Sequence, residues 1–98
     1  MTLRPFTTWA AQQIEKVLVR NDKRDKGPWE RQALDSLMRK ITEEYSELVD
    51  EYHKNDAEGI LRESVDLAAA AMMIAAKQHP LMRLLRRGRF VGTDGRKA

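Results

Sequence analysis

The sequence predicts an all-α fold in which an N-terminal helix accompanies a helical hairpin, and copies of the chain assemble into four-helix bundles. Helix-forming residues such as Ala, Leu, Met, Glu, Lys, Arg and Gln dominate the 98 residues, and only 6% are aromatic. Glycine and proline are sparse before residue 80. Apolar residues recur at helical spacing in three separate segments. A chain of this length forms one domain with a modest core.

The first helix is predicted from apolar residues at positions 10, 14, 17 and 18. Thr7 or Thr8 can cap its start, and we expect it to end near Arg20 or Asn21. The charged segment that follows, residues 21–29, contains Gly-Pro and is predicted to be a loop.

Two further helices follow, over residues 34–53 and 57–77, and form an antiparallel hairpin that turns at Asn55. The helix over residues 34–53 carries a broad apolar stripe. Asn55 can cap the second, with Glu58 completing a capping-box pattern, and Pro80 should end it. Residues 67–76 are apolar on every side, which a chain this small cannot bury alone. We therefore expect a homodimer or a homotetramer.

The chain divides into a helical domain, residues 1–80, and a basic C-terminal tail, residues 81–98, that we expect to be partly flexible. Between positions 83 and 97 the tail has basic residues at 83, 86, 87, 89, 96 and 97, and its acidic residue is Asp94. The net charge of the whole chain is only +3, so the tail carries most of the basicity.

Cysteine is absent, which excludes disulfides and thiolate metal sites. The N-terminus has no signal-peptide pattern, and the longest apolar run, residues 67–76, is far shorter than the ~20 residues of a membrane span. We expect a soluble, cytoplasmic protein that does not enter membranes.

Two acidic pairs share the same i, i+3 spacing: Glu44 with Glu47, and Glu63 with Asp66. This spacing places the members of a pair about 60° apart on one helix face. In a hairpin that turns at Asn55, residues whose numbers add to about 110 lie level, because each helix rises ~1.5 Å per residue. Glu44 then lies opposite Asp66. Glu47 lies opposite Glu63.

Carboxylates gathered in this way raise one another's pKa and oppose folding unless a cation neutralises them. Hard oxygen ligands favour Mg²⁺ or Mn²⁺ over zinc. The four acids therefore predict a site for Mg²⁺, with Mn²⁺ as the second choice. An ordinary solvated acidic face is the competing interpretation.

The order of the motifs resembles that of the MazG-like, all-α nucleoside triphosphate pyrophosphohydrolases. The resemblance covers about residues 9–78, from Lys26-Gly-Pro-Trp29 through Glu43-Glu44-x-x-Glu47 and Glu63-x-x-Asp66 to Met72-Met73-Ile-Ala. That family carries an EExxE segment on one helix and an ExxD segment on the next. The resemblance implies Mg²⁺-dependent hydrolysis of a nucleoside or deoxynucleoside triphosphate to the monophosphate and pyrophosphate, as part of nucleotide metabolism.

Matched residue by residue, the metal-binding acids are Glu44, Glu47, Glu63 and Asp66. Glu43 matches the first glutamate of EExxE. It is expected either to support the metal ligands without binding the ion or to act as a base. The candidate catalytic residues are Glu43, Glu44 and Glu47, because an acid not fully engaged by metal can accept a proton from the attacking water.

Basic and aromatic residues are the candidates for binding the substrate. Lys26 is the first candidate for the phosphates, with Lys77 and Arg39 behind it. The resemblance implies that Trp29 can stack on the base of the nucleotide and that Asn21 can contact the edge of that base. An ordinary solvated lysine at position 26 and an aromatic residue that closes the end of the bundle at position 29 are the alternatives.

One residue departs from the family pattern. Many relatives carry Asn three residues after the aspartate of ExxD, where this chain has Ala69, so the preferred base and sugar are left open. Two other functions compete with the enzyme: a helical dimerisation module, and a nucleic-acid binder that uses the basic tail. The tail lacks interleaved aromatics apart from Phe90, so we do not expect nucleic acid as the partner.

Overall fold

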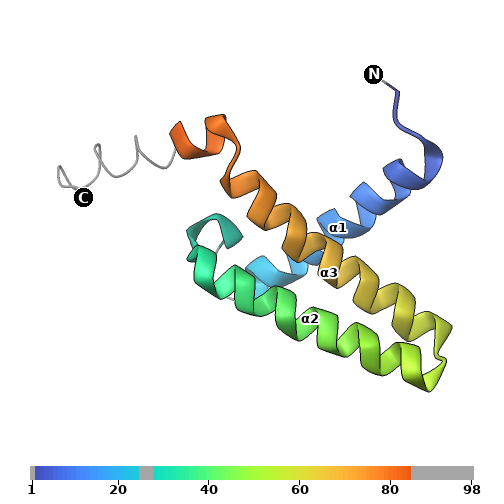
Figure 1. Cartoon of the computed structure of the whole chain (residues 1–98). Coiled ribbons are helices and arrows are strands. Elements are labelled where there is room, and N and C mark those ends of the chain that lie inside the picture. Colours follow the sequence, from blue (N-terminus) through green and yellow to red (C-terminus); the bar gives the residue numbers. More distant parts are fainter. Residues whose placement is uncertain (1, 25–27, 85–98) are drawn as a thin grey trace.

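The computed structural model describes residues 2–24 and 28–84, and every regular element in these ranges is a helix (Figure 1). The all-α prediction is therefore confirmed for this part of the chain. The elements are α1 (Pro5–Arg24), the short 3-10 helix η1 (Trp29–Arg31), α2 (Leu34–Lys54) and α3 (Ala57–Lys77). Residues 80–84 add a further helical stretch after α3.

α2 and α3 lie side by side as an antiparallel hairpin, and α1 crosses α3 (Figure 1). Within the described residues the backbone of α1 packs on α3 and on η1. α3 is therefore the central helix, and side chains from α1 and α2 meet at its surface.

The ends of α1 differ from the prediction at both sides. The helix begins at Pro5 rather than after Thr7 or Thr8, because proline suits the first helical position, where its fixed φ and missing N–H cost nothing. It continues to Arg24, so the first part of the predicted loop is helical. Lys23 and Arg24 in the last turn favour this extension, since positive charge stabilises a helix C-terminus.

The hairpin turn lies where the sequence predicts it, but its two residues have different roles. Asn55 adopts the left-handed conformation (φ 60°, ψ 37°) and ends α2, with its N–H bonded to the carbonyls of Glu51 and Tyr52. Asp56 caps α3, because its carboxylate accepts a hydrogen bond of 3.2 Å from the N–H of Gly59. The predicted capping box that starts at Asn55 is wrong by one residue, since asparagine tolerates the left-handed region that a helix end requires.

Replacing Asp56 with alanine is expected to lower the free energy of unfolding by about 1 kcal/mol, because the first turn of α3 loses its cap. Urea denaturation followed by circular dichroism measures the change. Asp50→Ala removes a carboxylate from an exposed position inside α2 and serves as the control. Equal losses in the two variants would contradict the capping role.

The core lies at the open end of the hairpin, away from the turn. It contains side chains from all four elements: Val17, Trp29, Leu37, Ala69 and Met73. Leu37 and Ala69 are fully covered, and Trp29 is only 8% exposed. Trp29 is therefore a side chain of the core. Ala69, the residue that departs from the family pattern, is part of the packed core.

Large apolar side chains remain exposed on α2: Leu34, Met38, Tyr45 and Tyr52 are 42–68% exposed. The exposed residues in the apolar run of α3 are alanines, whereas Met73 is buried. Surplus apolar surface thus lies on α2, and also on α1, where Phe6 is 85% exposed, rather than in the apolar run of α3. No helix in the described part of the chain is both long and apolar enough to cross a membrane.

Candidate metal centre

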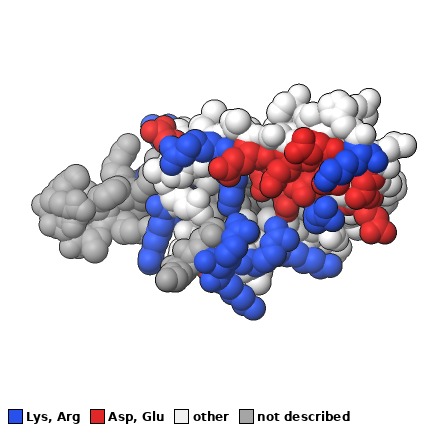
Figure 2. Space-filling model, turned by 90° about the horizontal axis from the view of Figure 1, so that it is seen from below, with Lys and Arg blue, Asp and Glu red and all other residues white. Residues whose placement is uncertain are grey.

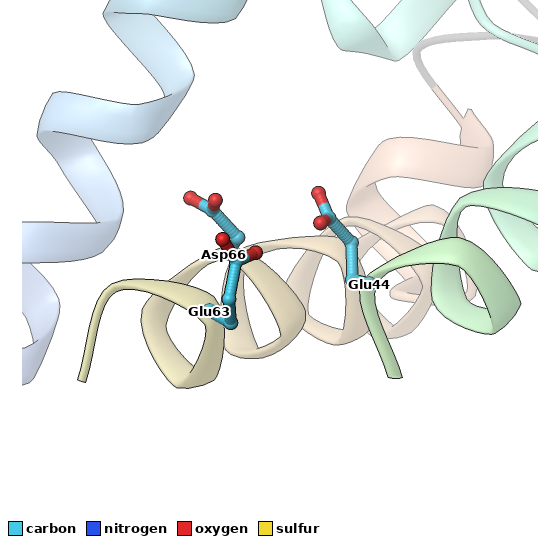
Figure 3. Close-up of side chains that lie close together, drawn as sticks. All are labelled: Glu44, Glu63 and Asp66. Carbon is cyan, nitrogen blue, oxygen red and sulfur yellow. The ribbon is translucent and has the colours of Figure 1, made fainter. Parts of the chain in front are cut away.

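Three acidic side chains converge in the middle of the hairpin (Figure 3). Glu44 comes from α2, while Glu63 and Asp66 lie one turn apart on α3. Each offers a carboxylate oxygen, and these oxygens all lie within 4.8 Å of one another. All three residues are half-buried, so water does not fully screen their charges.

The other two acids of the EExxE segment lie outside this group. Glu43 and Glu47 are both exposed. Three residues turn an α-helix by about 300°, so Glu47 points about 60° away from the direction of Glu44. Glu47 nevertheless stays in contact with the group through a side-chain hydrogen bond with Glu44. The structure thus brings together three of the four predicted metal ligands and places the fourth beside them.

The crowding changes the acidity of the group. Burial raises the pKa of Glu44 to about 8, and the hydrogen bond with Glu47 and the negative charges of Asp66, Glu47 and Glu63 add to the effect. The pKa of Glu63 is also raised, again mainly by burial, although its contact with Arg62 acts in the opposite direction. Without a cation, Glu44 is therefore protonated at neutral pH.

An unpaired oxygen on one member of the group suits a cation. Oε1 of Glu63 is buried and has no hydrogen-bond partner among the described residues. A buried acceptor without a partner costs free energy, which a bound cation would recover. Three converging carboxylate oxygens are hard ligands of the type that Mg²⁺ and Mn²⁺ prefer. The residues present therefore fit a divalent cation.

A basic residue from α1 also reaches the group. Arg20 forms an ion pair with Asp66, with Nη2 at 3.0 Å from Oδ1. Its side chain is 54% exposed, whereas that of Asp66 is 14% exposed. This contact could not be predicted from the sequence, because the two residues are 46 positions apart and the crossing of α1 over α3 is a tertiary feature.

Two of the residues predicted to bind the substrate, Asn21 and Lys77, are buried. Asn21 is buried in α1, and its Oδ1 has no partner among the described residues. Lys77 is 4% exposed and donates a 2.8 Å hydrogen bond to the carbonyl of Glu30. Lys77 follows Asp66 by eleven residues, which is ~16 Å along a helix. Lys26 lies outside the described residues.

Arg39, the remaining basic candidate, is exposed on α2. Its Nη2 donates a 3.3 Å hydrogen bond to the hydroxyl of Ser36, one turn earlier on the same helix. It therefore makes a local contact at the surface, and its guanidinium is not among the groups that gather with the carboxylates.

The stability of the metal-free protein is expected to fall as the pH rises from about 5 to about 8. In this range folded Glu44 keeps a proton that the unfolded chain releases, because its pKa is about 8 in the fold and 4.5 as a free side chain. Thermal unfolding in EDTA measures the decline. Millimolar Mg²⁺ should restore stability most strongly above pH 8, where the site is most negative.

Glu44→Gln is the control for this pH effect, since it removes the titrating group and should flatten the profile. A wild-type profile in EDTA that matches that of the variant would contradict the assignment.

Comparison of the chain with protein-family models, with curated proteins and with solved structures finds no match. The case for a function therefore rests on the motifs in the sequence and on the carboxylate geometry. Both point to the same residues of α2 and α3.

Proposed function

We propose that this chain is a Mg²⁺-dependent hydrolase that converts a nucleoside or deoxynucleoside triphosphate to the monophosphate and pyrophosphate. The observation that carries the proposal is the convergence of three carboxylate oxygens within 4.8 Å of one another, from Glu44, Glu63 and Asp66. The buried, unpaired Oε1 of Glu63 supports a cation at this place. The order of the motifs, which resembles that of the MazG-like enzymes, supplies the class of substrate.

The acids divide into two roles in this proposal. Glu44, Glu63 and Asp66 would hold the cation. Bound Mg²⁺ supplies charge neutralisation, polarisation of phosphoryl oxygens and a more acidic water. Glu47 is exposed and contacts Glu44 at the edge of the group, which suits a base that takes a proton from the attacking water. Glu43 is exposed and lies outside the group, so Glu47 is the better candidate for this step.

Glu47→Gln is expected to abolish turnover and yet to keep most of the stabilisation by Mg²⁺, because the three converging acids remain. Product formation and the shift in melting temperature with Mg²⁺ are measured on the same sample. Glu43→Gln makes the same chemical change one turn away and should retain activity. A variant at Glu47 that keeps full turnover would exclude it as the base.

Assembly into a homodimer or homotetramer in the cytoplasm is part of the proposal. The stripe on α2 formed by Leu34, Met38, Tyr45 and Tyr52 supplies apolar surface of the kind that a second copy would cover. Two hairpins packed in this way would make a four-helix bundle. Analytical ultracentrifugation measures the mass in solution, and a monomer at all concentrations would contradict the assembly.

The reaction is tested by incubating the protein with each common ribonucleoside and deoxyribonucleoside triphosphate in Mg²⁺ and separating the products by ion exchange. Monophosphate together with pyrophosphate from at least one nucleotide is the expected result. Diphosphate with orthophosphate, or no turnover with any nucleotide, would contradict the proposal. A parallel incubation in EDTA should give no product.

A further inference from the structure

We infer that the groove between α1 and α3 binds the phosphate chain of the substrate through Lys16, Arg20 and Arg62. The inference rests on the proposed function and deepens it, because it assigns the part of the site that receives the polyphosphate. None of these three residues belongs to the motifs that suggested the function.

The groove has a volume of about 350 Å³. Lys16 and Arg20 line it from α1, and Arg62 and Asp66 line it from α3. Small-molecule sites occupy about 300–1,000 Å³, so the groove is large enough for such a ligand. Its charged lining contains three cations against one carboxylate, which favours an anion.

The groove opens directly on the candidate metal centre. Asp66 belongs to both, because it lines the groove and contributes an oxygen to the carboxylate group. Arg62 forms an ion pair of 3.4 Å with Glu63 of the same group. Figure 2 shows acidic and basic side chains gathered in two adjacent bands on one face of the molecule. A polyphosphate held at the carboxylates by a cation would therefore lie next to these bases.

The basic surface continues along α1. Lys16 and Arg20 also line a second hollow, of about 690 Å³, together with Lys23, Arg24 and one acid, Glu15. The four basic residues follow one another at spacings of four, three and one, which places them along one side of the helix. The positive surface is thus longer than one phosphate group, as a chain of phosphates requires.

The two arginines are held loosely enough to change partner. The side chains of Arg20 and Arg62 are 54% and 55% exposed. Exposed ion pairs contribute little to stability. A cation that neutralises Glu63 and Asp66 would release both guanidinium groups. Arginine binds phosphate oxygens in a bidentate manner, so each is suited to the new partner.

Inorganic pyrophosphate with Mg²⁺ is the probe, and isothermal titration calorimetry measures its dissociation constant. Lys16→Gln is the sharpest variant, because Lys16 has no ion pair with any described residue and its loss leaves the carboxylates untouched. We expect Lys16→Gln, Arg20→Gln and Arg62→Gln each to weaken binding about tenfold or more. Arg4→Gln, at the residue just before α1, makes the same change of charge and should bind like the wild type.

The melting curve and the Mg²⁺-induced shift of Lys16→Gln should match the wild type, which separates a phosphate contact from a folding defect. Arg20→Lys should recover part of the affinity that Arg20→Gln loses. In the hydrolysis assay the KM for the nucleotide should rise in parallel with the dissociation constant of pyrophosphate.

The possible results keep the two proposals distinct. Hydrolysis with an unchanged KM and unchanged pyrophosphate affinity in Lys16→Gln and Arg62→Gln overturns the groove and leaves the proposed function standing. Binding of pyrophosphate that depends on Lys16, without hydrolysis of any nucleotide, overturns the enzyme and supports the groove as a polyphosphate site. No binding of pyrophosphate by the wild-type protein overturns the groove.

Discussion

Replacing Asp66 with asparagine is expected to lower the rate of pyrophosphate release by at least about a hundredfold. Even residues that only hydrogen-bond to a metal ligand typically cost about ten- to hundredfold in metal affinity or activity when they are replaced. Asparagine keeps the size of the side chain but removes the charge that both a cation and Arg20 require. The helix itself should persist, because Asp66 lies outside the apolar core. The value of kcat/KM with the preferred nucleotide, at several concentrations of Mg²⁺, measures the effect.

A matched control distinguishes the loss of a ligand from a general change of charge. Asp50→Asn removes the same charge from an exposed position on α2 and should retain activity. Asp66→Asn should also lose most of the increase in melting temperature that Mg²⁺ produces in the wild type. Full activity in Asp66→Asn would remove the proposed cation centre.

Leu37→Ala is expected to lower the free energy of unfolding by about 2–5 kcal/mol, because it leaves a cavity in a densely packed place. Leu37 is fully covered, and among the described residues it is, with Met73, one of the largest fully buried side chains. Domains are stable by only about 5–15 kcal/mol in total, and one with so small a core lies near the lower limit. We expect a broad or absent thermal transition.

Met38→Ala is the control for this effect, since Met38 is the next residue on α2 and is 52% exposed. Urea denaturation followed by circular dichroism compares the two variants. Equal and small losses would show that the core does not depend on Leu37.

The helices were predictable because their signals are local. Apolar residues repeat at helical spacing over each segment, and the hairpin turn can be located by counting from either side. The starts of helices were less certain because several residues compete for one role. Pro5 or Thr7 can begin α1, and Asn55 or Asp56 can cap α3, and the choice depends on backbone angles that the residue types do not fix.

The candidate site was predictable only in part, for the same physical reason. Spacing along each helix placed Glu63 and Asp66 together, and counting across the turn placed Glu44 beside them. How far Glu47 points outward depends on the rotation of α2 about its own axis. That rotation is set by side chains such as Leu37 packing on α3, which is not a local property. The contribution of Arg20 required the crossing of α1, which no spacing encodes.

The connection between α2 and α3 consists of two residues, Asn55 and Asp56. Because it is so short, the position of the carboxylates relative to one another depends on the geometry of the turn. So short a link leaves little freedom in the relative height and rotation of the two helices, and these two quantities decide whether Glu44 meets the carboxylates of α3. Folding and cation binding are then thermodynamically linked, because only the closed hairpin presents the ligands. A substitution in the turn would thus weaken cation affinity from about two to three helical turns away, without touching a ligand.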